Sequence, residues 1–153
     1  MARITGAGAV FVSRGDESGT HVREKMLWQA AGATPAPGKL IETGQGMAAT
    51  LRVAAQRNGY VLTDEATLAR LADAVSVTTL YADDPVLINT YAVAIISTAP
   101  GHRYATASEL ARWLAEGDAQ RLIDGFRIGG RQVFFGWPAG VDYSSPESVP
   151  GAR

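Results

Sequence analysis

The stretch FVSRGDESGTH, Phe11–His21, joins an apolar run to a polar turn that contains glycines, hydroxyl side chains and an arginine. The run at 9–13 is typical of a buried strand, and the sequence at 21–32 predicts a helix that begins directly after the turn. Such a strand, turn and helix place free backbone amides and the positive end of a helix dipole at the carboxyl edge of a sheet. This geometry predicts an anion site there.

The rest of the first half repeats this alternation of strand and helix. Strands are predicted at 39–43 and 60–63, and helices at 47–59 and 65–74. Asp64 is expected to cap the second of these helices, because its carboxylate can accept from the first free amides. In the helix predicted at 21–32, the face expected to be buried carries Val22, Met26 and Leu27. The alternation predicts an α/β fold, a three-layer sandwich with a mainly parallel sheet.

The second half is expected to continue with strands at 75–81 and 87–97, followed by a helix at 105–126 that breaks near Gly117. The segment RIGGRQVFFGW, 127–137, combines arginines, a glycine turn and aromatic residues. That composition is compatible with base stacking, but a β-hairpin is the favoured interpretation because no further basic cluster accompanies it. Residues 1–140 are expected to form a single domain, and the Ser/Pro/Gly-rich segment 141–153 a disordered tail.

Composition excludes several classes of function. The formal net charge of -1 over 153 residues gives no global field that would attract nucleic acid or an anionic membrane. The chain has no cysteine, which excludes disulfides, thiolate metal sites and a cysteine nucleophile. The longest apolar stretch is too short to span a bilayer, and no signal-peptide pattern is present.

The turn after the first strand contains the donors that an anion needs. Hydroxyl groups come from Ser13, Ser18 and Thr20, the fixed charge comes from Arg14, and the glycines allow a ligand to approach the backbone. A second interpretation is that Ser18 or Asp16 merely caps the helix while Arg14 pairs with a neighbouring acid in solvent. Residue spacing alone leaves both interpretations open.

Two long blocks, FVSRGDESGTHVREKMLW at 11–28 and IETGQGMAATLRVAAQRNGYVLTD at 41–64, resemble the tungstate-binding family of type II periplasmic binding proteins. These proteins are the solute receptors of tungstate ABC transporters. The resemblance runs from about Val10 to Trp137. It implies a periplasmic-binding-protein-like lobe that binds tungstate, molybdate or a similar tetrahedral oxyanion, without catalysis and without a cofactor. It also implies a transporter permease as partner.

Position by position, the resemblance implies two groups of ligand-binding residues. In the first turn, Ser13 and Arg14 contact the anion, and the start of the helix donates from Ser18, Gly19 and Thr20. Asp16 belongs to the same group and orients Arg14, because a carboxylate would repel a bare tungstate. The second turn, on the same edge, consists of Thr43, Gly44, Gln45 and Gly46.

The sequence departs from the family at its beginning. Full receptors of the family have two lobes, and nothing in MARITGAGAV, 1–10, matches the Thr/Ser-rich loop of the first lobe. The chain resembles the later half of a receptor, which leaves open a stand-alone regulatory or assembly domain that acts through protein contacts. A homodimer would then cover the surface of the missing lobe. The resemblance implies a periplasmic or extracellular location, and the lack of a leader leaves the cytoplasm open.

An enzyme is not expected, because no nucleophile with a base and no metal cluster can be named. His21 and Glu24 are three residues apart on one helix face, a spacing that suits a metal or acid–base work. The second histidine, His102, is far away in the sequence. We therefore expect His21 to make a polar contact behind the anion turn, and Glu24 to pair with Arg23 or Lys25.

Overall fold

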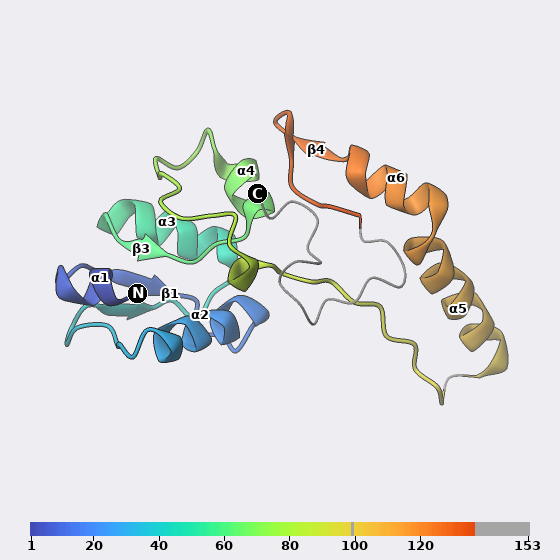
Figure 1. The fold of residues 1–153 in the computed structure, drawn as a ribbon, viewed down its shortest axis with the longest axis horizontal. Coiled ribbons are helices and arrows are strands. Elements are labelled where there is room, and N and C mark those ends of the chain that lie inside the picture. Colours follow the sequence, from blue (N-terminus) through green and yellow to red (C-terminus); the bar gives the residue numbers. More distant parts are fainter. Residues whose placement is uncertain (99, 137–153) are drawn as a thin grey trace. The chain divides into compact units, whose positions relative to one another are not determined.

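The computed structural model describes residues 1–98 and 100–136, and the chain divides into two compact units, Met1–Thr79 and Leu80–Arg153 (Figure 1). The predicted tail at 141–153 and the domain limit at residue 140 lie outside the described residues. A single domain over 1–140 stays a prediction.

A three-stranded parallel sheet forms the centre of the first unit. Its middle strand is β1 (Phe11–Ser13), flanked by β2 (Leu40–Glu42) and β3 (Tyr60–Val61) in the order β2-β1-β3. In this register Phe11 lies opposite both Leu40 and Tyr60. The predicted α/β fold with a mainly parallel sheet is confirmed, and the carboxyl ends of all three strands meet at one edge.

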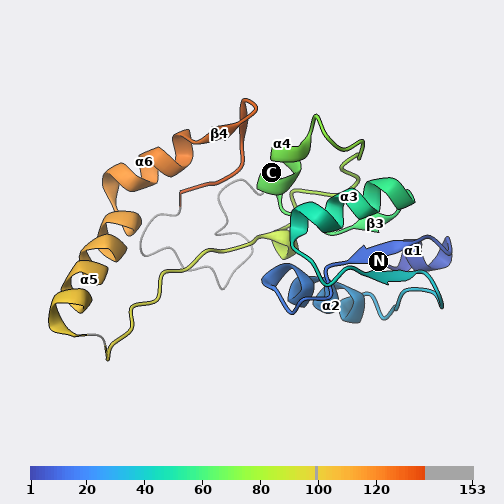
Figure 2. The ribbon, with the colours of Figure 1, turned by 180° about the vertical axis from the view of Figure 1, so that it is seen from behind.

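Helices connect these strands: α1 (Ala2–Gly6) precedes β1, α2 (Gly19–Ala30) follows it, α3 (Met47–Arg57) leads to β3, and α4 (Glu65–Leu71) comes last. The chain runs from β1 to β2 on one side, and then crosses β1 to reach β3 on the other side. Right-handed crossovers in opposite directions place α2 and α3 on opposite faces of the sheet. Both views show these two helices on either side of β1, which makes three layers (Figures 1 and 2).

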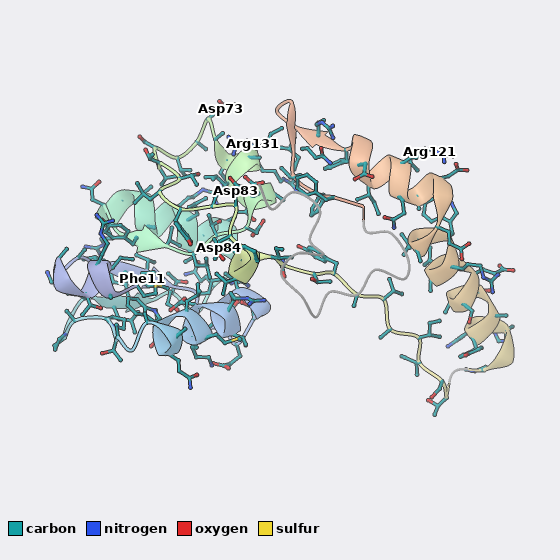
Figure 3. All side chains as sticks on the ribbon, in the orientation of Figure 1. Phe11, Asp73, Asp83, Asp84, Arg121 and Arg131 are labelled. Carbon is teal, nitrogen blue, oxygen red and sulfur yellow. The ribbon has the colours of Figure 1, made fainter. Side chains whose placement is uncertain are left out.

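The core of the first unit packs around β1. Val12 and Leu51 are fully buried, and the rings of Phe11 and Trp28 meet edge to face with their centroids 5.1 Å apart (Figure 3 labels Phe11). Edge-to-face pairs of this kind are a preferred aromatic geometry. Both helices are thereby attached to the central strand, one on each face.

The buried face of α2 differs from the predicted one. Val22 and Met26 are exposed, and the helix instead buries His21, Glu24 and Trp28. These three residues follow the i, i+3, i+7 spacing of a helix face. The prediction was wrong because it assigned the buried face from apolar residues alone, whereas two of the three inward positions carry ionisable side chains.

The second unit contains helices and a hairpin. Its elements are η1 (Pro85–Leu87), α5 (Gly101–Ala115), α6 (Gly117–Gly125), β4 (Arg127–Ile128) and β5 (Arg131–Gln132). The predicted break near Gly117 is confirmed. The hairpin is confirmed as well: β4 and β5 are antiparallel, and Gly129 and Gly130 between them have φ of 56° and 79°. Positive φ at both central residues is what a tight hairpin turn requires.

In the described part of the chain, residues 75–81 and 87–97 form no strand, so these two predictions were wrong. Residues 88–96 have no regular secondary structure, and the side chains of Tyr91 and Ile96 are largely exposed. β-propensity describes fit to a neighbouring strand, and without such a neighbour a β-prone sequence forms no ladder. A homodimer that covers the surface of the missing lobe stays a prediction.

No helix in the part of the chain that the structure describes is long and apolar enough to cross a membrane.

The core predicts a sharp contrast between two truncations in the first unit. Leu51→Ala removes a fully buried side chain, whereas Met26→Ala shortens one that is 53% exposed. We expect Leu51→Ala to lower the free energy of unfolding by about 2–5 kcal/mol, and Met26→Ala to change it by less than about 0.5 kcal/mol. Urea unfolding followed by fluorescence measures both. Equal effects of the two variants would contradict the assigned core.

Candidate oxyanion site at the carboxyl edge of the sheet

The turns after β1 and β2 are joined by hydrogen bonds, as their parallel pairing requires. The amide of Thr43 donates to the carbonyl of Ser13 at 3.1 Å, and the Thr43 hydroxyl lies 3.3 Å from the same oxygen. The hydroxyl also lies 2.8 Å from that of Thr50 on α3. The two predicted groups of site residues, 13–20 and 43–46, therefore lie side by side at one edge.

Arg14 is held in a fixed orientation by Asp16. Its Nε and one terminal nitrogen donate to Oδ2 of Asp16 at 3.0 and 2.5 Å, and both side chains are about four-fifths buried, with 18% and 21% exposed. The other guanidinium N–H groups have no acceptor among residues 1–98 and 100–136. This arrangement agrees with the expected role of Asp16 in orienting Arg14.

Asp16 is ionised across the whole working range of pH. Hydrogen bonds from Ser18 and Arg14, partly opposed by burial, lower its pKa from 3.8 to about 2. The second carboxylate oxygen accepts from the Ser18 amide at 3.2 Å. A permanently charged acid beside the site disfavours an anion that carries no proton, unless Arg14 and the backbone amides outweigh it.

The turn is closed by bonds that consume most of its amides. Gly15 N–H donates to the Ser13 hydroxyl oxygen at 3.2 Å, and Glu17 N–H donates to Nδ1 of His21 at 3.1 Å. Ser18 caps α2 by accepting from the His21 amide at 3.4 Å. The expected polar contact of His21 behind the turn is thus confirmed.

Four amides at the two helix starts stay available. Gly19 and Thr20 occupy the first two positions of α2, and Met47 and Ala48 those of α3. None has an acceptor in the part of the chain that the structure describes. Amides in the first helical turn have no intrahelical partner, and Gly46 at the start of α3 offers no side-chain cap. Four N–H groups and two dipole ends therefore face the same edge.

The hydroxyl groups divide into two kinds. Those of Ser13, Ser18 and Thr43 are engaged within the protein, and Ser13 is 1% exposed. The hydroxyl of Thr20 has no hydrogen-bond partner within 1–98 and 100–136. Direct anion contact by Ser13 stays a prediction, and its observed bonds show a role inside the turn.

Glu24 is buried and bonded to the anion turn, which the sequence analysis did not predict. It is 5% exposed and accepts from the Ser13 hydroxyl at 2.8 Å, so the expected pair with Arg23 or Lys25 is not its principal contact. Lys25 instead pairs with Glu17 at 2.8 Å. The spacing from His21 to Trp28 was the available signal, because it puts Glu24 on the inward face.

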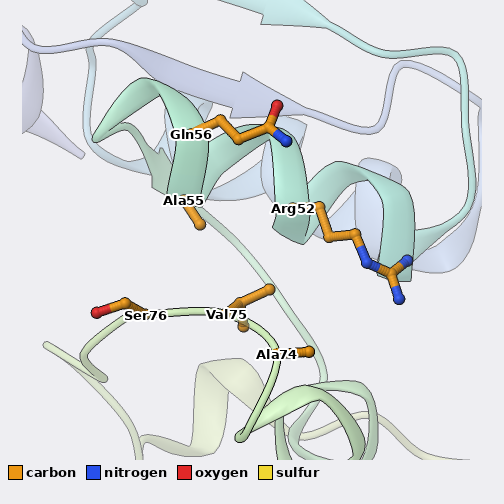
Figure 4. A pocket seen from close by; sticks show the side chains of 6 residues that line it. All are labelled: Arg52, Ala55, Gln56, Ala74, Val75 and Ser76. Carbon is orange, nitrogen blue, oxygen red and sulfur yellow. The ribbon is translucent and has the colours of Figure 1, made fainter.

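Two other features are not part of the predicted site. Asp64 accepts from the amide and hydroxyl of Thr67 at 2.7 and 2.8 Å, which confirms it as the cap of α4. A pocket between α3 and the residues after α4 contains none of the predicted site residues (Figure 4). Its lining consists of Arg52, Ala55, Gln56, Ala74, Val75 and Ser76. Among the described residues, no group of three or more acidic or histidine side chains could hold a metal ion.

A family model described as a PBP superfamily domain matches residues 3–118. The chain belongs to the PBP superfamily. It is 35% identical over 142 residues to a Haloferax volcanii protein whose name marks it as a candidate anion-binding protein of an ABC transporter. It is also 32% identical over 133 residues to the tungstate-binding protein TupA of Campylobacter jejuni.

These relatives are longer than the chain. The matched region covers 88% and 81% of the chain, but 42% of the Haloferax protein and 49% of the Campylobacter protein. The solved tungstate-binding protein TupA of Desulfovibrio alaskensis G20 has a TM-score of 0.66 and 31% identity, over 88% of this chain and 57% of that one. The likeness therefore confirms a PBP-like lobe that spans about half of its relatives.

Alanine substitutions at two glycines near the turn are expected to affect the free energy of unfolding very differently. Gly15 has φ of 61°, and a Cβ atom there would lie 3.0 Å from Cβ of Glu42, whereas Gly19 has nothing within 4 Å. We expect Gly15→Ala to cost about 1–2 kcal/mol or more because alanine is strained in this conformation. Gly19→Ala should stay within about 1 kcal/mol of the parent. Thermal unfolding compares them, and a harmless Gly15→Ala would contradict the described turn.

Proposed function

We propose that this chain binds a tetrahedral oxyanion of the tungstate or molybdate type at the carboxyl edge of β1 and β2. The observation that carries the proposal is the meeting of two helix starts and an oriented arginine at one edge. Available amides at Gly19, Thr20, Met47 and Ala48 lie on the turns that flank Arg14. Such donors suit a doubly charged ligand whose oxygens point in several directions.

The same proposal covers each predicted site residue. Arg14 and the start of α2 at Gly19 and Thr20 supply direct donors, Ser18 caps that helix and bonds Asp16, and the turn at 43–46 supplies the second side of the cradle. Ser13 and Asp16 shape the first turn from within, through their bonds to Gly15 and Arg14. The relatives named as tungstate-binding proteins support tungstate as the ligand to test first.

The charge of Asp16 bears on which oxyanion is preferred. Hydrogen phosphate carries a proton that it can donate to a carboxylate, whereas tungstate, molybdate and sulfate carry none near neutral pH. Because Asp16 already receives bonds from Arg14 and Ser18, it has less capacity to accept a proton from the ligand. We infer that the unprotonated anions bind more tightly than phosphate.

In its cellular role, the chain would act as a module of an ABC-transporter solute receptor, without catalysis. Its partner would be the transporter permease, and its location periplasmic or extracellular. The relative named for ABC-transporter anion binding supports this role. Binding by the single lobe is expected to be weaker than binding by a receptor that encloses its ligand, because fewer donors surround the anion.

An anion panel tests the proposal. Tungstate, molybdate, sulfate and phosphate are added to the chain, and thermal unfolding is followed. A ligand present at about 100 times its dissociation constant should add roughly 2.7 kcal/mol to the free energy of unfolding. Arg14→Ala removes a charge-assisted donor and should weaken binding by about 10- to 100-fold.

The matched control is Arg57→Ala, in the last turn of α3 and thus at the opposite end of that helix from the site. It removes the same formal charge and should keep the tungstate shift. Absence of a shift with every anion at millimolar concentration would overturn the proposal. An equal loss in Arg14→Ala and Arg57→Ala would reduce it to a general charge effect.

A further inference from the structure

A buried acid lies directly behind the anion turn. Glu24 is on the inward face of α2, 5% exposed, and its Oε2 accepts the hydroxyl proton of Ser13 at 2.8 Å. Ser13 is the last residue of β1 and is itself 1% exposed. Burial of a charged group is costly unless it is hydrogen-bonded, so the Ser13 hydroxyl compensates part of that cost.

The bond to Glu24 sets the direction of a second hydrogen bond. A serine hydroxyl has one proton to donate. While Glu24 accepts that proton, the Ser13 oxygen presents its lone pairs to the turn, and the Gly15 amide donates to it at 3.2 Å. If the hydroxyl turned away from Glu24, its proton could point at the Gly15 amide and the second bond would be lost.

We propose that Glu24 is a positioning residue of the oxyanion site: it fixes the Ser13 hydroxyl, which holds the Gly15 amide and the turn Arg14–Ser18. Gly15 has φ of 61°, so the direction of the turn depends on this residue. The conformation of this turn then determines where Arg14 and the start of α2 lie. This inference rests on the proposed function, because the turn is the one that would hold the anion.

Protonation of Glu24 should then be linked to anion binding. The groups that face it are Ser13 from β1, His21 and Trp28 from α2, and Glu42 from β2. Burial raises the pKa of Glu24, with the Ser13 bond acting in the opposite direction. A doubly negative ligand nearby would raise that pKa further. Binding therefore favours the protonated acid, so affinity should rise as the pH falls.

Asp16 cannot produce this pH dependence, because its pKa of about 2 keeps it ionised throughout. The comparison with Glu24→Gln isolates the part due to Glu24. Glutamine keeps a carbonyl oxygen that accepts from Ser13 and loses the titration, whereas Glu24→Ala loses both.

The experiment measures tungstate and molybdate affinity by calorimetry between pH 6 and 8, on the full chain. We expect Glu24→Ala to bind at least about 10-fold more weakly than wild type, and Glu24→Gln to stay within about 3-fold of wild type at pH 6. The pH profile of Glu24→Gln should be flatter. Equal affinity of wild type and Glu24→Ala throughout this pH range would overturn the proposal.

Hydrogen exchange of the Gly15 amide, measured by NMR without ligand, separates this proposal from the proposed function. Exchange should be at least about 10-fold faster in Glu24→Ala than in wild type and unchanged in Glu24→Gln. If Glu24→Ala does not fold, Ser13→Ala takes its place, because it removes the hydroxyl that Glu24 positions for the Gly15 amide. Failure of wild type to bind would overturn the proposed function, whereas unchanged Gly15 exchange would by itself overturn the positioning role.

Discussion

The parallel pairing of β1 with β2 is the constraint on which the candidate site depends. It aligns Ser13 with Glu42, so the turns that follow these two residues begin side by side. The Thr43 amide and hydroxyl then connect the second turn to the end of β1. Because α2 and α3 start from these turns, their first amides arrive at the same edge. A shift in this register would separate Arg14 from the second helix start.

The sequence predicted the frame of the first unit because its signals are local. Apolar runs identified β1, β2 and β3, and Asp64 identified the start of α4 through a cap that needs only three neighbouring residues. The turns after β1 and β2 could be located for the same reason, whereas the role of their residues in binding was implied by the family resemblance. In the second unit, Gly129 and Gly130 specified the hairpin, since a tight turn between antiparallel strands needs positive φ at both positions.

The inward face of α2 could not be predicted from apolar periodicity. His21 and Glu24 occupy it because the turn needs an acceptor for the Glu17 amide and for the Ser13 hydroxyl. Here the requirements of the site override the usual preference for apolar residues in a core. The strands predicted at 75–81 and 87–97 failed for a different reason: strand formation depends on a neighbour, and no local pattern specifies one. Anion contacts by the named residues stay predictions.

The most direct test of the account is a crystal of the chain soaked in tungstate, with the tungsten located by its anomalous scattering. The account predicts one strong peak at the carboxyl edge of β1 and β2. The tungstate oxygens should lie about 3 Å from the Gly19 and Thr20 amides and from the Arg14 guanidinium. A peak elsewhere on the first unit, with those amides still bare, would contradict it.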